Sequence, residues 1–143
     1  VEDVAAGRSH LLSTTLVQVK TIHDQGKTPA IYTTRQELTF PDVDTRLAFG
    51  EQVSALLMDI VRGLPSDLGY LISKGGITSN DTLSQGLALE KTRLLGQVLP
   101  GVSVVRTEAD HPQFSAMPVV LFPGNVGDEN ALALAYQRLS SGR

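Results

Sequence analysis

The sequence predicts an α/β fold, a layered sandwich in which helices flank a central sheet that is largely parallel or mixed. Segments with apolar residues at helical spacing alternate along the chain with short apolar runs that suit strands. Glycine and proline separate these segments, and no repeat or low-complexity tract divides them. Because helices and strands of this length pack as layers around one core, we expect a single domain over residues 1–143.

The first part of the chain is expected to contain two helices with a strand between them. Apolar residues recur at helical spacing from Ser9 to Gln25, and Gly26 follows where a C-terminal cap would fall. Residues 28–33 are a strand candidate. A wide apolar stripe from Asp44 to Arg62 predicts a second helix, which Gly63-Leu64-Pro65 ends. The residues expected to face inward are Leu12, Leu16, Val19, Ile22 and, partly buried, His23 in the first helix, and Phe49, Val53, Leu56, Leu57 and Ile60 in the second.

The next part is expected to begin with a strand and a helix. The apolar run Gly69–Ser73 is too short for a helix and suits a buried strand. A helix is predicted from about Ser79 to Arg93. Pro100-Gly101 marks a tight turn, so residues 95–98 and 102–105 are expected to form a hairpin or a pair of short strands.

The chain closes with its clearest strand and a last helix. Pro118–Phe122 is apolar and runs directly into a glycine turn. A helix is expected from about Asp128 to Leu139. Its inward residues are predicted to be Leu132, Ala135, Tyr136 and Leu139.

The composition excludes several classes of protein. With 12 Lys and Arg residues against 15 Asp and Glu residues, the net charge is -3, which offers no basic surface for nucleic acid or an anionic membrane. The absence of cysteine excludes thiol nucleophiles, zinc ribbons and redox pairs and is compatible with a reducing cytoplasm. No apolar run approaches the roughly 20 residues that span a bilayer. His10, His23 and His111 lie in separate segments without ligand spacing, so we expect no metal site.

Two turns share one layout, in which an apolar strand ends in glycines and opens a helix. They are Lys74-Gly75-Gly76-Ile77-Thr78 and Gly124-Asn125-Val126-Gly127. Ligands of open α/β sheets bind beyond the carboxyl ends of the strands, and both turns are expected at that edge. At the first turn, glycines allow close approach of an anion, the helix start presents N–H groups, and Lys74 and Thr78 add a charge and a hydroxyl. The spacing matches neither a P-loop nor a dinucleotide fingerprint, which argues against a nicotinamide-dependent oxidoreductase domain.

A purely structural role for both turns remains open. Thr78 can be the N-cap of the first helix, with Asp81 completing a capping box. Asn125 can cap the second helix, where Asp128 and Glu129 favour the helix dipole and tend to repel a bound phosphate. Local sequence alone therefore leaves phosphate binding and helix capping as alternatives.

The two motifs resemble those of the four-carbon acid sugar kinase family. Its C-terminal nucleotide-binding domain carries a Gly-Gly-acid-Thr turn after one strand and a Gly-Asn-x-Gly turn after the last, matched by residues 74–79 and 124–127. The stretch 94–102 is also similar, and the resemblance is strong from about Tyr70 to Leu139. It implies transfer of the γ-phosphoryl group of ATP, with Mg²⁺, to the terminal hydroxyl of threonate, erythronate or an oxo-tetronate. The residues that would bind the nucleotide are Gly75, Gly76, Ile77, Thr78 and Gly124 by resemblance, with Lys74 as a counter-charge and Asn125 as a turn former.

The sequence departs from the family pattern at two points, and the resemblance implies several further expectations. Ile77 stands where many members have Asp or Glu, so this side chain cannot organise a metal ion. The chain starts at Val1 without methionine, and we expect a further glycine- and serine-rich turn and the sugar-binding N-terminal domain to lie upstream. We assign no catalytic base here and expect this chain alone to bind nucleotide weakly without turnover. A cytoplasmic enzyme is expected, a homodimer is one possible assembly, and the alternative function is a non-catalytic module that binds nucleotide or phosphate.

Overall fold

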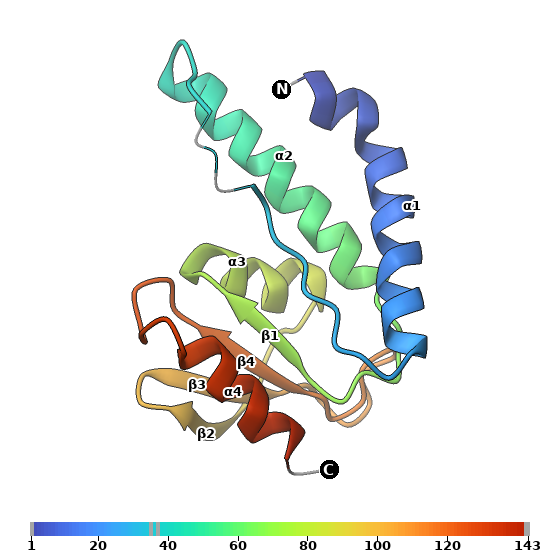
Figure 1. Ribbon diagram of the computed structural model, residues 1–143, viewed down its shortest axis with the longest axis vertical. Coiled ribbons are helices and arrows are strands. Elements are labelled where there is room, and N and C mark those ends of the chain that lie inside the picture. The colour runs from blue at the N-terminus through green and yellow to red at the C-terminus, as the bar shows by residue number, and fades with distance from the viewer. Residues whose placement is uncertain (1, 35, 37, 142–143) are drawn as a thin grey trace. The chain divides into compact units, whose positions relative to one another are not determined.

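The computed structural model describes residues 2–34, 36 and 38–141, with side chains from residue 7 onward (Figure 1). The chain divides into two compact units, Val1–Pro65 and Ser66–Arg143. The single domain expected from the sequence stays a prediction. Among the helices described, none has the length and apolar character needed to cross a lipid bilayer.

The N-terminal unit is built from two helices, α1 (Glu2–Asp24) and α2 (Val43–Arg62). Both were expected, although α1 begins several residues before Ser9. Asp42 caps α2, since its carboxylate accepts the backbone N–H of Thr45 at 2.7 Å. This hydrogen bond holds the pKa of Asp42 below its usual value, because it favours the ionised form.

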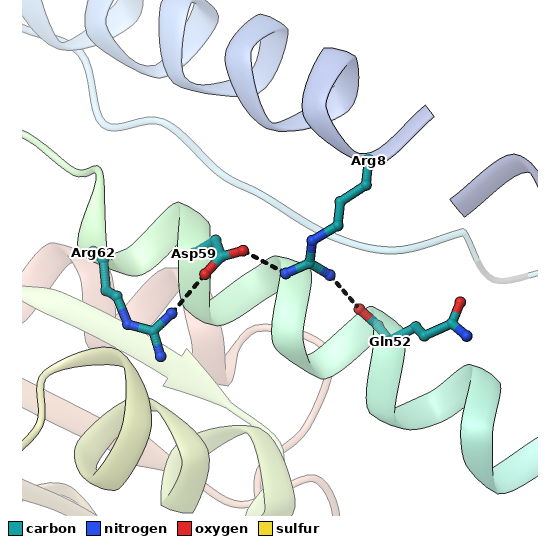
Figure 2. Close-up of polar contacts among 4 residues, drawn as sticks. All are labelled: Arg8, Gln52, Asp59 and Arg62. Carbon is teal, nitrogen blue, oxygen red and sulfur yellow. Dashed lines mark hydrogen bonds and ion pairs between the residues drawn. The ribbon is translucent and has the colours of Figure 1, made fainter. Parts of the chain in front are cut away.

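An ionic network links the two helices of this unit. Figure 2 shows Asp59 of α2 between Arg8 of α1 and Arg62 of α2, and both guanidinium groups donate to its carboxylate. Arg8 also donates to the backbone carbonyl oxygen of Gln52 at 3.3 Å. One carboxylate therefore pairs with an arginine of each helix.

The strand expected over residues 28–33 is not formed. This segment has no regular secondary structure, and Tyr32 is 85% exposed. The expectation was wrong because β-branched and aromatic residues form a strand only where a neighbouring strand accepts their backbone hydrogen bonds. The described part of the N-terminal unit contains no strand that could do so.

The C-terminal unit contains a four-stranded mixed sheet in the order β1-β4-β3-β2. Strands β1 (Leu71–Lys74) and β4 (Pro118–Phe122) pair in parallel. The hairpin of β2 (Arg93–Leu99) and β3 (Val102–Arg106) turns at Pro100-Gly101, and β3 pairs with β4 in antiparallel fashion. The α/β class is thus confirmed with a mixed sheet, in which one pairing of three is parallel.

Helices cover both faces of this sheet (Figure 1). On one face α4 (Ala131–Ser140) packs its buried Ala131 and Ala135 against the sheet. On the other face α3 (Gly76–Asp81) lies against β1 and β4 and continues into the π-helical turn η1 (Thr82–Gly86). The core beneath α4 comprises Leu99, Val102, Val104, Val120, Phe122, Ala131 and Ala135.

The helix expected from Ser79 to Arg93 is displaced towards the N-terminus. It starts at Gly76, widens to a π-helical turn at Thr82 and ends at Gly86. Leu87 is buried and Ala88 adopts a left-handed φ of 51°. The left-handed backbone at Ala88 therefore ends the helix before the apolar pattern does.

The last helix also differs from its prediction. It starts at Ala131 rather than Asp128, and its buried face is formed by Ala131 and Ala135, with Leu139 half-buried. Leu132 and Tyr136, expected to point inward, are exposed by 45% and 42%. Small residues face the sheet here because a close helix-to-sheet approach leaves little space for larger ones.

Candidate functional site

The parallel pairing of β1 with β4 brings the two glycine turns to one edge of the sheet. Lys74, the last residue of β1, is the register partner of Phe122, the last residue of β4. Residues 75–78 and 123–127 therefore leave the sheet side by side. The expectation that both turns lie at the carboxyl edge agrees with this pairing.

Direct contacts join the two turns. The backbone N–H of Gly75 donates to the carbonyl oxygen of Phe122 at 2.8 Å. The ammonium group of Lys74 donates to the carbonyl oxygen of Pro123 at 3.3 Å and lies 4.4 Å from the centroid of the Phe122 ring. An exposed positive charge is thus held where the turns meet.

Gly75 shapes the first turn. Its φ of 111° lies in the region that favours glycine, and its carbonyl oxygen accepts the N–H of Ser79 at 2.9 Å. Gly75 is therefore the N-cap of α3, and Thr78 lies inside the first turn. The capping box of Thr78 and Asp81 is wrong, because the helix begins two residues before it.

Gly127 shapes the second turn. It has a φ of 84°, and a Cβ atom added to it would lie 2.4 Å from the Cβ of Ala131. Asn125 is exposed and is not the cap of α4, whose N-cap is Asn130. Asp128 instead accepts the N–H of Asn130 at 2.9 Å, so this carboxylate organises the end of the turn.

Gly76 and Gly124 have no such structural explanation. Neither lies in the left-handed φ region, and, apart from the adjacent residues and the local helix backbone, no heavy atom would come within 4 Å of an added Cβ at either position. Neither the fold nor the local packing therefore requires glycine there. Both positions leave the main chain open to a ligand.

A comparison with known protein families adds a finding to this geometry. The family model described as a nucleotide-binding C-terminal domain matches residues 1–132. The chain belongs to this family. Such domains are found in four-carbon acid sugar kinases, so the resemblance seen in the sequence is confirmed at the level of the family. No curated protein matches the chain, and no solved structure does.

Buried hydroxyl groups support the first turn of this nucleotide-binding domain. Ser79 donates to the carbonyl oxygen of Ser73 at 3.0 Å, and the hydroxyls of Ser73 and Thr82 lie 3.0 Å apart. All three residues are buried. They fasten α3 to the end of β1, a role that the sequence analysis did not assign. The available signal was the presence of small polar residues at the end of β1 and in the helical segment that follows it.

The β-hairpin turn is a second feature that the sequence analysis did not connect with the nucleotide-binding turns. A Cβ atom added to Gly101 would lie 3.3 Å from Cγ1 of Val126, so the Pro100-Gly101 turn reaches the second glycine turn. Because β3 starts where β4 ends, this turn shares the same edge. Local sequence carries no signal for this contact.

The candidate residues form an open surface of the domain. Ile77 is 80% exposed and stands in the first turn of α3. The structure has one pocket of about 670 Å³ lined by residues 38–43 and Arg46 and another of about 480 Å³ beside the β2–β3 hairpin, and none of the seven candidate residues lines either. A ligand here would meet main chain and the Lys74 charge on one side only.

Proposed function

We propose that this chain is the ATP-binding part of a kinase that phosphorylates the terminal hydroxyl of a four-carbon sugar acid. The observation that supports it most is the pair of glycine turns at one sheet edge, joined by the 2.8 Å hydrogen bond between Gly75 and Phe122. Phosphoryl transfer depends on positioning and on neutralising phosphate charge, and both needs suit this edge.

The proposed contacts use main-chain groups first. Gly76, Ile77 and Thr78 lie in the first turn of α3, where backbone N–H groups lack partners within the helix. Gly124 and Asn125 would approach the same phosphates from the second turn. Lys74 would then exchange its contact with a neutral carbonyl for one with a phosphate oxygen, which is a stronger charge-assisted interaction.

We propose that Mg²⁺ reaches this site bound to the nucleotide. Among the described residues, no group of three or more His, Cys, Asp or Glu side chains could hold a metal ion. When bound with the nucleotide, Mg²⁺ would neutralise negative charge on the phosphate groups. The exposed Ile77 supplies no ligand atom, so this chain's contribution would be main-chain amides and the Lys74 ammonium group.

The substrate side of the reaction belongs, in this proposal, to an N-terminal domain of the same cytoplasmic protein. The open glycine surface encloses a ligand on one side only, which supports weak nucleotide binding by this chain alone. A second domain that covers this surface would exclude water and supply the base that accepts the sugar hydroxyl proton.

The decisive experiment measures ATP consumption by the longer protein that includes the sugar-binding domain. Threonate, erythronate and oxo-tetronates would be supplied in turn with ATP and Mg²⁺, and ADP release would be followed. We expect turnover with one of these acids, and kcat/KM lowered about tenfold or more in Gly76→Ala and Gly124→Ala. Gly50→Ala, in the exposed middle of α2, is the matched control and should keep full activity.

The second candidate function is a non-catalytic module that binds a nucleotide or phosphate. Ile77 in place of an acidic residue favours it. Binding of ADP at the two turns without turnover of any four-carbon sugar acid by the longer protein would support the module and contradict the kinase. If Gly76→Ala and Gly124→Ala leave turnover unchanged, the assignment of the nucleotide to the two glycine turns is contradicted for both candidate functions.

A further inference from the structure

A second pocket lies at the end of the sheet opposite the glycine turns, beside the start of β2 and the end of β3. It has a volume of about 480 Å³. No prediction from the sequence singled it out, and none of its residues belongs to the candidate nucleotide site. The polar residues that line it are Lys91, Thr92, Arg93, Arg106, Thr107 and Glu108.

The feature that sets this pocket apart is a pair of opposed arginines. Arg93 and Arg106 are register partners in the antiparallel β2–β3 pairing. Side chains of directly opposite residues leave the same face of a sheet with Cβ atoms about 4.5–5.5 Å apart, and like charges in such a pair destabilise the sheet. The next pair along this hairpin, Leu94 and Val105, is apolar.

The acidic groups nearby are directed to another cation. Glu108 pairs with Lys91 at 3.1 Å, and this contact, with a smaller contribution from Asp110, raises the pKa of Lys91. Among the described side chains, neither Arg93 nor Arg106 has a hydrogen-bond or ion-pair partner. The pocket is therefore lined by two arginines from opposite strands, and its one lining carboxylate, Glu108, pairs with Lys91.

We propose that Arg93 and Arg106 together bind the phosphate group of a small ligand, at a site separate from the nucleotide-binding turns. A phosphate group carries about −1.5 to −2 charges at neutral pH, which matches two guanidinium groups. Each guanidinium can donate two parallel hydrogen bonds to such a group. The overall net charge of -3 argues against a nucleic acid as the source of that phosphate.

The test uses inorganic phosphate as the probe and sodium chloride at equal ionic strength as the control. Phosphate at ten times its Kd should raise the melting temperature of the chain by about 4 °C, and chloride should not reproduce this shift. Arg93→Gln and Arg106→Gln should each weaken phosphate binding about tenfold or more. Both should melt at or above the wild-type temperature without phosphate, because they remove the repulsion.

Arg46→Gln is the matched control variant, since it removes one exposed positive charge from α2. It should bind phosphate like the wild type. Backbone amide signals of Arg93 and Arg106 should shift on phosphate addition. A parallel titration with glycerol phosphate gives a second Kd to compare with that of inorganic phosphate. The lower of the two Kd values shows whether the site prefers a phosphomonoester or free phosphate.

Three results would overturn this proposal. They are an equal shift with chloride, unchanged phosphate affinity in both arginine variants, and amide shifts confined to Gly76 and Gly124. The last result would place the phosphate at the nucleotide turns, so failure here is distinguishable from failure of the proposed kinase function.

Discussion

Adding one methyl group at Gly76 or Gly124 separates the fold of this domain from its proposed binding role. Apart from the adjacent residues and the local helix backbone, no heavy atom lies within 4 Å of the Cβ position at either residue. Gly76→Ala should therefore raise the free energy of unfolding by about 0.4–1 kcal/mol, because alanine restricts the unfolded chain. Gly124→Ala should change it by less than about 1 kcal/mol.

The same methyl group would occupy space that a phosphate oxygen needs to reach the main-chain N–H groups. Losing one charge-assisted hydrogen bond costs about 1.5–3 kcal/mol, so the Kd for ADP-Mg²⁺ should rise about 10- to 150-fold. Titrations followed by the backbone amide signals of Gly75, Gly76 and Gly124 in the wild type measure this Kd even when binding is weak.

Gly50→Ala is the control for a glycine substitution that affects stability and lies outside the proposed binding site. It also adds a methyl group in open space, at an exposed position in the interior of α2, and should stabilise the chain while leaving the ADP affinity unchanged. Stable Gly76→Ala and Gly124→Ala variants that bind ADP within twofold of the wild type would refute the reasoning.

Three further predictions concern the fold. Gly127→Ala should lower the free energy of unfolding by about 1–3 kcal/mol in urea titrations, because the φ of 84° and the 2.4 Å approach to α4 exclude a Cβ atom; an unchanged midpoint would contradict this geometry. Asp59→Ala should lower the free energy of unfolding by about 1 kcal/mol, after allowance for the partial exposure of Asp59, because two arginines lose their shared carboxylate. Urea unfolding followed by far-UV circular dichroism measures this change. Asp42 has a pKa below the ordinary 3.8, so its cap stabilises the fold above that pH and is lost as pH falls through the folded-state value. The melting-temperature difference between the wild type and Asp42→Asn should shrink below pH 3.8, and a constant difference would argue against the carboxylate cap.

The agreement between sequence and structure is best where the signal is local. Pro118–Phe122 was predicted with its observed bounds, and the hairpin around Pro100-Gly101 was placed correctly. Dense β-branched residues and a Pro-Gly turn indicate these elements without reference to distant residues. Where backbone conformation or packing decided the outcome, as at Ala88 or in the exposure of Tyr136, the periodic pattern was insufficient.

The sequence by itself determined the class of fold, the family and the location of both glycine turns along the chain, because helical spacing, short apolar runs and glycine pairs are properties of neighbouring residues. Only the tertiary structure decided that the turn after β1 meets the turn after β4, 49 positions away between Lys74 and Pro123. It also decided which glycines the backbone requires and which leave the main chain open, and that Arg93 faces Arg106. These outcomes depend on strand order and register, which arise from hydrogen bonds and packing between segments that are distant in the sequence.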